Sequence, residues 1–156
     1  MATITRQIAT EDDLLAAPED GFKRELVDGE IRMSPAGARH GHVCMQLGSR
    51  LTAFVQTGDM GFVFDSSTGF RLPGGNVRLP DVAFVASGRF EGDNPPVGFS
   101  PVPPDLAVEV LSPSDRPRQV LDRIGEYLGA GVPLVWVIDP EGRKGGQPLM
   151  PVEPLE

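Results

Sequence analysis

Cysteine, lysine and histidine are scarce in this chain. The single cysteine, Cys44, excludes a disulfide within the chain, so a reducing cytoplasm is the expected setting. Only two of the 14 basic residues are lysines, Lys23 and Lys144, and the others are arginines. Arginine favours two-point contacts with phosphate or carboxylate, although GC-rich coding gives the same bias and is the weightier explanation.

Long hydrophobic runs are also missing, which excludes a transmembrane helix, and acidic residues at positions 11–13 interrupt the start too early for a signal peptide. No glycine-rich phosphate loop, nucleophile elbow or CxxC pair is found. The net charge of −8 argues mildly against a broad nucleic-acid-binding face, but a local arginine cluster around bound cations could still bind phosphate. A length of 156 residues with 40% hydrophobic residues predicts one globular domain.

The order of hydrophobic patterns predicts a mixed α/β (α+β-like) fold. Thr10 and Asp13 form a capping box for a short helix, Asp28-Gly29 centres a hairpin, and Ser114 or Asp115 is expected to cap a later helix. The expected elements are a helix from residue 10, a hairpin over 22–33, a helix over 38–57, strands at 62–64, 68–72, 78–85 and 105–111, a helix up to about 129 and a strand at 132–138. Residues 1–142 are expected to form the domain. Residues 143–156 are expected to be an irregular tail, either because the domain is cut short there or because these residues were added to it.

Two carboxylates stand out, because each lies in an apolar run where valine or isoleucine would be the usual residue. Asp81 and Glu109 occupy neighbouring predicted strands, and a carboxylate buried there must pair, shift its pKa or bind a metal. Oxygen ligands on rigid strands suit Mg²⁺ or Mn²⁺. The alternative is structural: Asp81 would cap a turn after Pro80, and Glu109 would pair with an arginine such as Arg123. The spacing alone favours neither.

Further candidates are weaker. His40 begins the inward face of the helix over 38–57, where it could ligate a metal or transfer a proton, although such a histidine is more often a hydrogen-bonded core residue. Glu25 and Glu30 are ordinary hairpin residues unless the hairpin lies beside the strands. Cys44 lies on the same inward face as His40 and is expected to pack there and not to act as a nucleophile.

Several motifs together resemble those of one family. They are Glu25-Leu-Val-Asp-Gly-Glu30, Met33-Ser-Pro35 followed by His40, Pro80-Asp81-Val, Pro104-Asp-Leu-Ala-Val-Glu-Val-Leu-Ser-Pro-Ser114, Tyr127-x-x-x-Gly131-Val and Trp136-Val-Ile-Asp-Pro140. In order and spacing they resemble the Uma-two-type family of "putative restriction endonucleases", within the PD-(D/E)XK nuclease superfamily. The resemblance covers roughly residues 10–142.

The resemblance implies a restriction-endonuclease-like fold, with a central mixed sheet between helices and a metal site on two strands. It makes Asp81 and Glu109 the metal ligands. The superfamily's lysine is absent at Leu111, and its counterpart on the following helix is Arg123. Arginine stays protonated, so Arg123 could stabilise charge but could not act as a general base. The attacking hydroxide would then have to come from the action of the metal alone on its bound water, or from proton transfer to His40.

The resulting hypothesis is a cytoplasmic, bacterial, Mg²⁺- or Mn²⁺-dependent endonuclease that hydrolyses DNA phosphodiester bonds. Asp81 and Glu109 would bind the metal, Arg123 and His40 would assist, and Glu25 and Glu30 are secondary candidates. The alternative is a catalytically impaired nuclease-fold module that binds nucleic acid or a protein partner, which Arg123 and the short C-terminus both favour. No membrane association is expected, and a homodimer is compatible with the superfamily.

Overall fold

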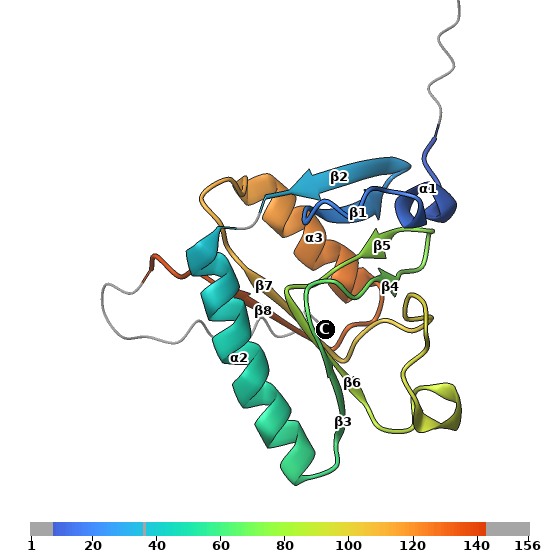
Figure 1. The fold of residues 1–156 in the computed structure, drawn as a ribbon, viewed down its shortest axis with the longest axis vertical. Coiled ribbons are helices and arrows are strands. Elements are labelled where there is room, and N and C mark those ends of the chain that lie inside the picture. The colour runs from blue at the N-terminus through green and yellow to red at the C-terminus, as the bar shows by residue number, and fades with distance from the viewer. Residues whose placement is uncertain (1–7, 36, 143–156) are drawn as a thin grey trace, which may run out of the picture.

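A computed structural model describes residues 8–35 and 37–142 of the chain. The described part has four helical segments and eight strands, coloured along the chain in Figure 1. In order they are α1 (Glu11–Leu15), β1 (Lys23–Val27), β2 (Glu30–Ser34), α2 (Ala38–Thr57), β3 (Gly61–Phe64), β4 (Phe70–Arg71), β5 (Val77–Arg78), β6 (Val82–Ala86), the 3₁₀ turn η1 (Glu91–Asp93), β7 (Leu106–Val110), α3 (Pro117–Gly129) and β8 (Leu134–Ile138). The predicted tail over 143–156 lies outside the described residues.

The strands form two sheets of four strands each. The central sheet has the order β3-β6-β7-β8, with β7 and β8 parallel and the other pairs antiparallel, so the mixed sheet predicted from the sequence is confirmed. The hairpin β1-β2 does not extend this sheet. It forms a second, antiparallel sheet of order β2-β1-β5-β4, which lies across one end of the domain (Figure 1).

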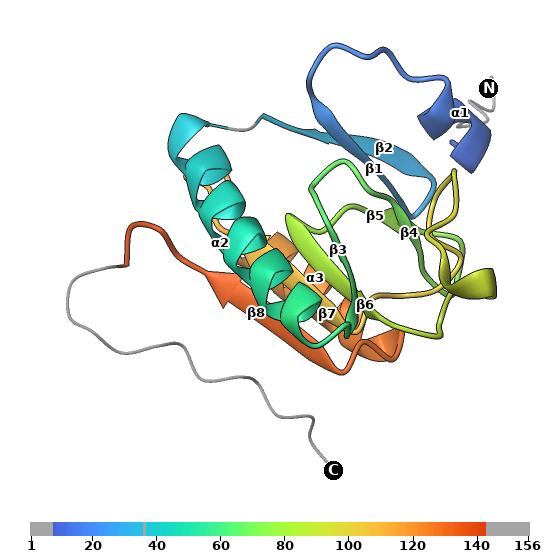
Figure 2. The same ribbon diagram turned by 60° about the horizontal axis from the view of Figure 1, so that its bottom comes forward.

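Helices α2 and α3 pack against the central sheet, as the turned view in Figure 2 shows. Alternation along β7 divides its side chains between the two helices. Val108 and Val110 pack with the apolar face of α2, whereas Ala107 packs with Tyr127 of α3. All five residues of β7 are buried, and Glu109 is the only charged one among them. The strand therefore carries one carboxylate into an otherwise apolar layer.

The single strand predicted over 78–85 was wrong: Val77–Arg78 forms β5 of the second sheet, Val82–Ala86 forms β6 of the central sheet, and Asp81 lies between them. Local signals placed several other element ends correctly. The Thr10–Asp13 capping box is present, and both Asp28 and Gly29 have positive φ, as the tight hairpin turn requires. The prediction that Ser114 or Asp115 caps α3 was wrong. The N-cap is Arg116, and the Asp115 carboxylate accepts the backbone N–H of Ser112 at 2.7 Å instead. Within the described residues, no helix is long and apolar enough to cross a membrane.

Gly61 begins β3 at a point of close backbone approach. Its φ is 142°, and a Cβ added there would lie 2.2 Å from the carbonyl oxygen of Val85. We expect Gly61→Ala to lower the free energy of unfolding by about 2 kcal/mol, through backbone strain and overpacking, in urea denaturation. Gly125→Ala is the matched control, because that site in α3 has open space. It should raise stability by about 0.5–1 kcal/mol. Equal effects at both sites would contradict the close approach.

Candidate metal and phosphate site

A small pocket opens where the hairpin sheet, the first turns of α2 and the end of β7 meet. Its volume is about 30 Å³, enough for an ion with a water molecule. Most of the side chains that line it are polar or charged, and they come from six separate segments. They are Lys23, Glu25, Ser34, Pro35, His40, Asp81, Val110, Ser112, Asp115 and Arg123.

Asp81 lies directly before β6, and hydrogen bonds from three different elements hold its carboxylate. The backbone N–H of Val110 donates to Oδ2 at 2.8 Å, His40 Nε2 lies 3.1 Å from the same oxygen, and Lys23 Nζ lies 2.9 Å from Oδ1. Burial opposes the charged form, but the His40 contact and the Lys23 charge outweigh it and lower the pKa of Asp81 to about 2. Asp81 is therefore a carboxylate at neutral pH.

Glu109 is almost completely buried, with 1% of its surface exposed. Both of its oxygens accept hydrogen bonds from α3. The Tyr127 hydroxyl donates to Oε1 at 2.8 Å, and Nη1 of Arg123 donates to Oε2 at 2.7 Å. Burial raises the pKa of Glu109, and the charges of Lys23 and Arg123 act in the opposite direction. The ion pair between Glu109 and Arg123, which the sequence suggested as an alternative to metal binding, is thus present. It does not remove Glu109 from the site, because each carboxylate oxygen has a second lone pair.

Lys23 is the functional candidate that the sequence reasoning missed. Burial disfavours its ammonium, but the negative charges of Glu109, Asp81 and Glu25 raise the pKa of Lys23 above its usual value. Lys23 therefore contacts Asp81 directly and is also stabilised by the charges of Glu109 and Glu25. Two features of the sequence could have identified it. Side chains two residues apart on a strand point to the same face, so Lys23 lies on the same side of β1 as Glu25. Lys23 is also the only lysine among the described residues.

Glu25 also lines the pocket, and its carboxylate holds the second sheet together. The backbone N–H of Leu79 donates to Oε1 at 2.8 Å, and Arg78 NH1 donates to Oε2 at 3.1 Å. Arg78 also contacts Glu126 of α3 through NH2 at 2.6 Å, which ties the hairpin sheet to the helix. Glu30, the other hairpin candidate, is half-buried beside the turn and is not among the pocket residues.

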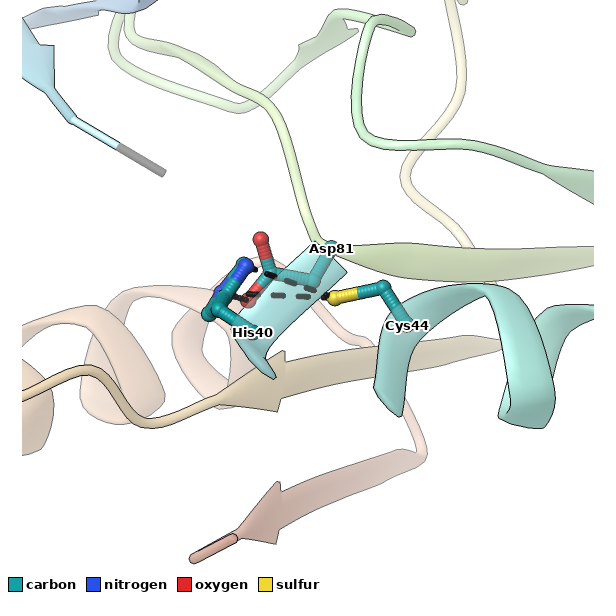
Figure 3. Close-up of side chains that lie close together, drawn as sticks. All are labelled: His40, Cys44 and Asp81. Carbon is teal, nitrogen blue, oxygen red and sulfur yellow. Dashed lines mark hydrogen bonds and ion pairs between the residues drawn. The ribbon is translucent and has the colours of Figure 1, made fainter. Parts of the chain in front are cut away.

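His40 and Cys44 lie one helical turn apart on α2, and both face Asp81 (Figure 3). Cys44 Sγ is 3.6 Å from Nδ1 of the imidazole. The hydrogen bond with Asp81 raises the pKa of His40, although burial opposes this. Burial, followed by the charge of Asp81, raises the pKa of Cys44 to about 12, so Cys44 is a neutral thiol. This agrees with the expectation that it is not a nucleophile.

The pocket thus brings together five of the six residues predicted from the sequence. Asp81, His40, Arg123 and Glu25 line it, and Glu109 lies behind it, in contact with Arg123 and within electrostatic range of Lys23. Lys23, Arg123 and Arg78 pair with Asp81, Glu109 and Glu25, so these six charges balance. Carboxylate oxygens are nevertheless the preferred ligands of hard divalent cations. The carboxylate of Asp81, which lines the pocket, is therefore chemically suited to a divalent cation.

These features define a class: an α/β domain with a small pocket, lined mainly by polar and charged side chains, at the end of its central sheet. A family model described as "Putative restriction endonuclease", named Uma2, matches residues 11–144. The chain belongs to the Uma2 family. The family resemblance deduced from the motifs is confirmed.

A solved structure shares the fold. It is a crystal structure from Anabaena variabilis, described as "a putative nuclease belonging to DUF820", with a TM-score of 0.72 and 24% sequence identity. The match covers 85% of this chain and 74% of the Anabaena chain. It confirms the predicted restriction-endonuclease-like arrangement of a mixed sheet with helices. No curated protein matches the chain.

Proposed function

We propose that this protein is a Mg²⁺- or Mn²⁺-dependent endonuclease that hydrolyses phosphodiester bonds in DNA at the pocket around Asp81. The observation that carries the proposal is the pocket itself, where Asp81 contacts Lys23 and Arg123 contacts Glu109. Asp81 lies directly before β6 and Glu109 lies within β7, at the positions that the family motifs supply. Membership of a family described as restriction endonucleases supports the reaction class and DNA as the substrate.

The acidic side chains would hold the metal ion. Asp81 stays ionised down to about pH 2, and its Oδ1 faces the pocket side occupied by the Lys23 ammonium. Glu109 would contribute the second oxygen from behind, with its orientation fixed by Tyr127 and Arg123. A bound divalent cation polarises a phosphate and lowers the pKa of a water molecule.

The basic side chains would receive the phosphate. Lys23, His40 and Arg123 line the pocket from β1, α2 and α3, so basic groups gather there although the whole chain is acidic. Arg123 remains protonated and can stabilise charge that develops on phosphate. Lys23 has three ammonium donors and would supply the amine that the sequence lacks at Leu111. Its contact with Asp81 holds the amine at the edge of the pocket.

A second candidate function is a nuclease-fold module that binds nucleic acid or a protein without cleaving it. One observation favours it: Lys23, Arg123 and Tyr127 already satisfy both carboxylates, so the folded protein does not require a metal for charge balance. Under this alternative the chain would bind DNA and leave it intact, with or without Mn²⁺.

Plasmid cleavage in Mn²⁺ separates the two functions. We expect nicking or linearisation by the wild type, no cleavage after chelation with EDTA, and at least about a hundredfold loss in Asp81→Asn and Glu109→Gln. Each variant removes an ionic oxygen ligand, and metal-bound charge stabilisation amounts to several kcal/mol. Glu91→Gln, an exposed carboxylate in η1, is the control and should cleave normally. Wild-type cleavage no greater than that of the two site variants would refute the catalytic proposal.

A homodimer, a cytoplasmic location and a bacterial source remain predictions. Sedimentation equilibrium tests the first directly. Cleavage of both DNA strands by a symmetric dimer would require the pockets of the two subunits to face one duplex.

A further inference from the structure

The geometry points to a second cation site, formed by His40, Cys44 and Asp81, for a thiophilic divalent ion of the Zn²⁺ class. Figure 3 shows the three side chains converging, two from α2 and one from the segment before β6. The candidate ligand atoms all lie within 4.8 Å of one another. This site shares only Asp81 with the proposed Mg²⁺ or Mn²⁺ site, and it differs from it in ligand chemistry.

The distances suit a tetrahedral ion. His40 Nε2 lies 3.1 Å from Asp81 Oδ2 and 4.0 Å from Cys44 Sγ. Ordinary bond lengths of about 2.0–2.1 Å to nitrogen or oxygen and about 2.3 Å to sulfur place neighbouring tetrahedral ligands roughly 3.3–3.6 Å apart. Small side-chain adjustments of about 1 Å would therefore bring the three atoms to ligand distance. The ion would take the place of the proton that His40 and Asp81 now share.

The backbone holds the ligands in this arrangement. His40 and Cys44 are four residues apart, the helical spacing that places two side chains on the same face. Asp81 is fixed independently by the N–H of Val110, which uses one lone pair of Oδ2 and leaves the other directed to His40. His40 and Asp81 line the pocket, which gives an ion a route from solvent and a position for a water as fourth ligand.

The ligand set determines which metals are bound. A thiolate and an imidazole favour Zn²⁺ or Co²⁺ over Mg²⁺, which takes oxygen ligands and keeps its waters. Without a metal Cys44 is a neutral thiol and adds no charge beside Asp81, whereas a divalent ion displaces the proton of a thiol that coordinates it. The presence of sulfur therefore separates this site from the oxygen-lined one.

Co²⁺ titration of the full-length protein tests the site. We expect a thiolate-to-Co²⁺ charge-transfer band in the near ultraviolet that saturates at one ion per chain and disappears when Zn²⁺ is added. Because Cys44 is the only cysteine, the band can arise only from it. Cys44→Ser should abolish the band, and His40→Asn should weaken Co²⁺ binding by at least about tenfold. Circular dichroism would confirm that both variants are folded.

His42→Ala is the matched control, because His42 is the other histidine, lies on the same helix and is exposed. It should leave the titration unchanged. No band in the wild type, or a band that survives unchanged in His40→Asn, would overturn the inference. The measurement uses no DNA and no Mg²⁺, so its outcome is independent of whether the protein cleaves plasmid.

Discussion

Lys23→Met is expected to destabilise the metal-free protein by about 3–5 kcal/mol. The substitution removes the ammonium that contacts Asp81 and whose charge also offsets those of Glu109 and Glu25, and breaking a buried ion pair by removing one partner has this magnitude. Urea denaturation in EDTA measures the loss. Arg118→Met, an exposed cation of α3, is the control and should change stability by less than about 0.5 kcal/mol.

Divalent cations should partly restore the stability of this variant. If the metal occupies the space beside Asp81 and Glu109, Mn²⁺ at a hundred times its dissociation constant stabilises the fold by about 2.7 kcal/mol. The wild type should gain less, because its ammonium competes with the ion. Plasmid cleavage by Lys23→Met should stay about 10²–10³-fold below wild type even in saturating Mn²⁺, since a phosphate donor is missing. Normal stability in EDTA would show that Lys23 does not balance the carboxylates.

Arg123→Met is expected to lower the free energy of unfolding by a similar amount, about 3–5 kcal/mol, because Glu109 would keep only the Tyr127 hydroxyl as a hydrogen-bond partner. Arg123→Lys should be much milder. Lysine retains the charge, and it removes the Arg123 Nε, a buried donor without a hydrogen-bond partner among the described residues. Thermal denaturation of the three proteins in EDTA makes the comparison.

The same pair of variants addresses the role of the guanidinium in cleavage. Since Lys23 already supplies an amine, Arg123→Lys should cleave within about tenfold of wild type. A large gain would show that the arginine limits catalysis, as its replacement of the superfamily lysine first suggested. Equal stability of Arg123→Met and wild type would contradict the buried ion pair with Glu109.

Local patterns in the sequence predicted most of the fold because their causes are local. The Asp28-Gly29 turn fixed the hairpin register, with Val27 opposite Glu30, and the period of the apolar residues gave α2 its full extent. The second sheet could not be predicted in the same way. β5 contains only two residues, and it pairs with β1 through a contact between Leu26 and Val77 that no local pattern specifies.

The site was predictable wherever a charge lay in an apolar run. Asp81 and Glu109 stood out for that reason, and the structure pairs Asp81 with Lys23 and Glu109 with Arg123. Lys23 itself escaped notice because a lysine near the start of a hairpin strand is ordinary on a solvent-facing edge. Only the packing of the hairpin over the end of the central sheet makes it a buried partner, and that packing depends on long-range contacts such as Arg78 with Glu126.

The pocket is assembled from parts that are far apart along the chain. Glu109 and Arg123 are 14 residues apart and can meet early in folding, whereas Lys23 and Asp81 are 58 apart and His40 and Asp81 are 41 apart. Contacts of such separation require long loops to close and generally form late. Cation binding would therefore report the final steps of folding, and a partly folded chain would have its buried glutamate pair before it had any pocket.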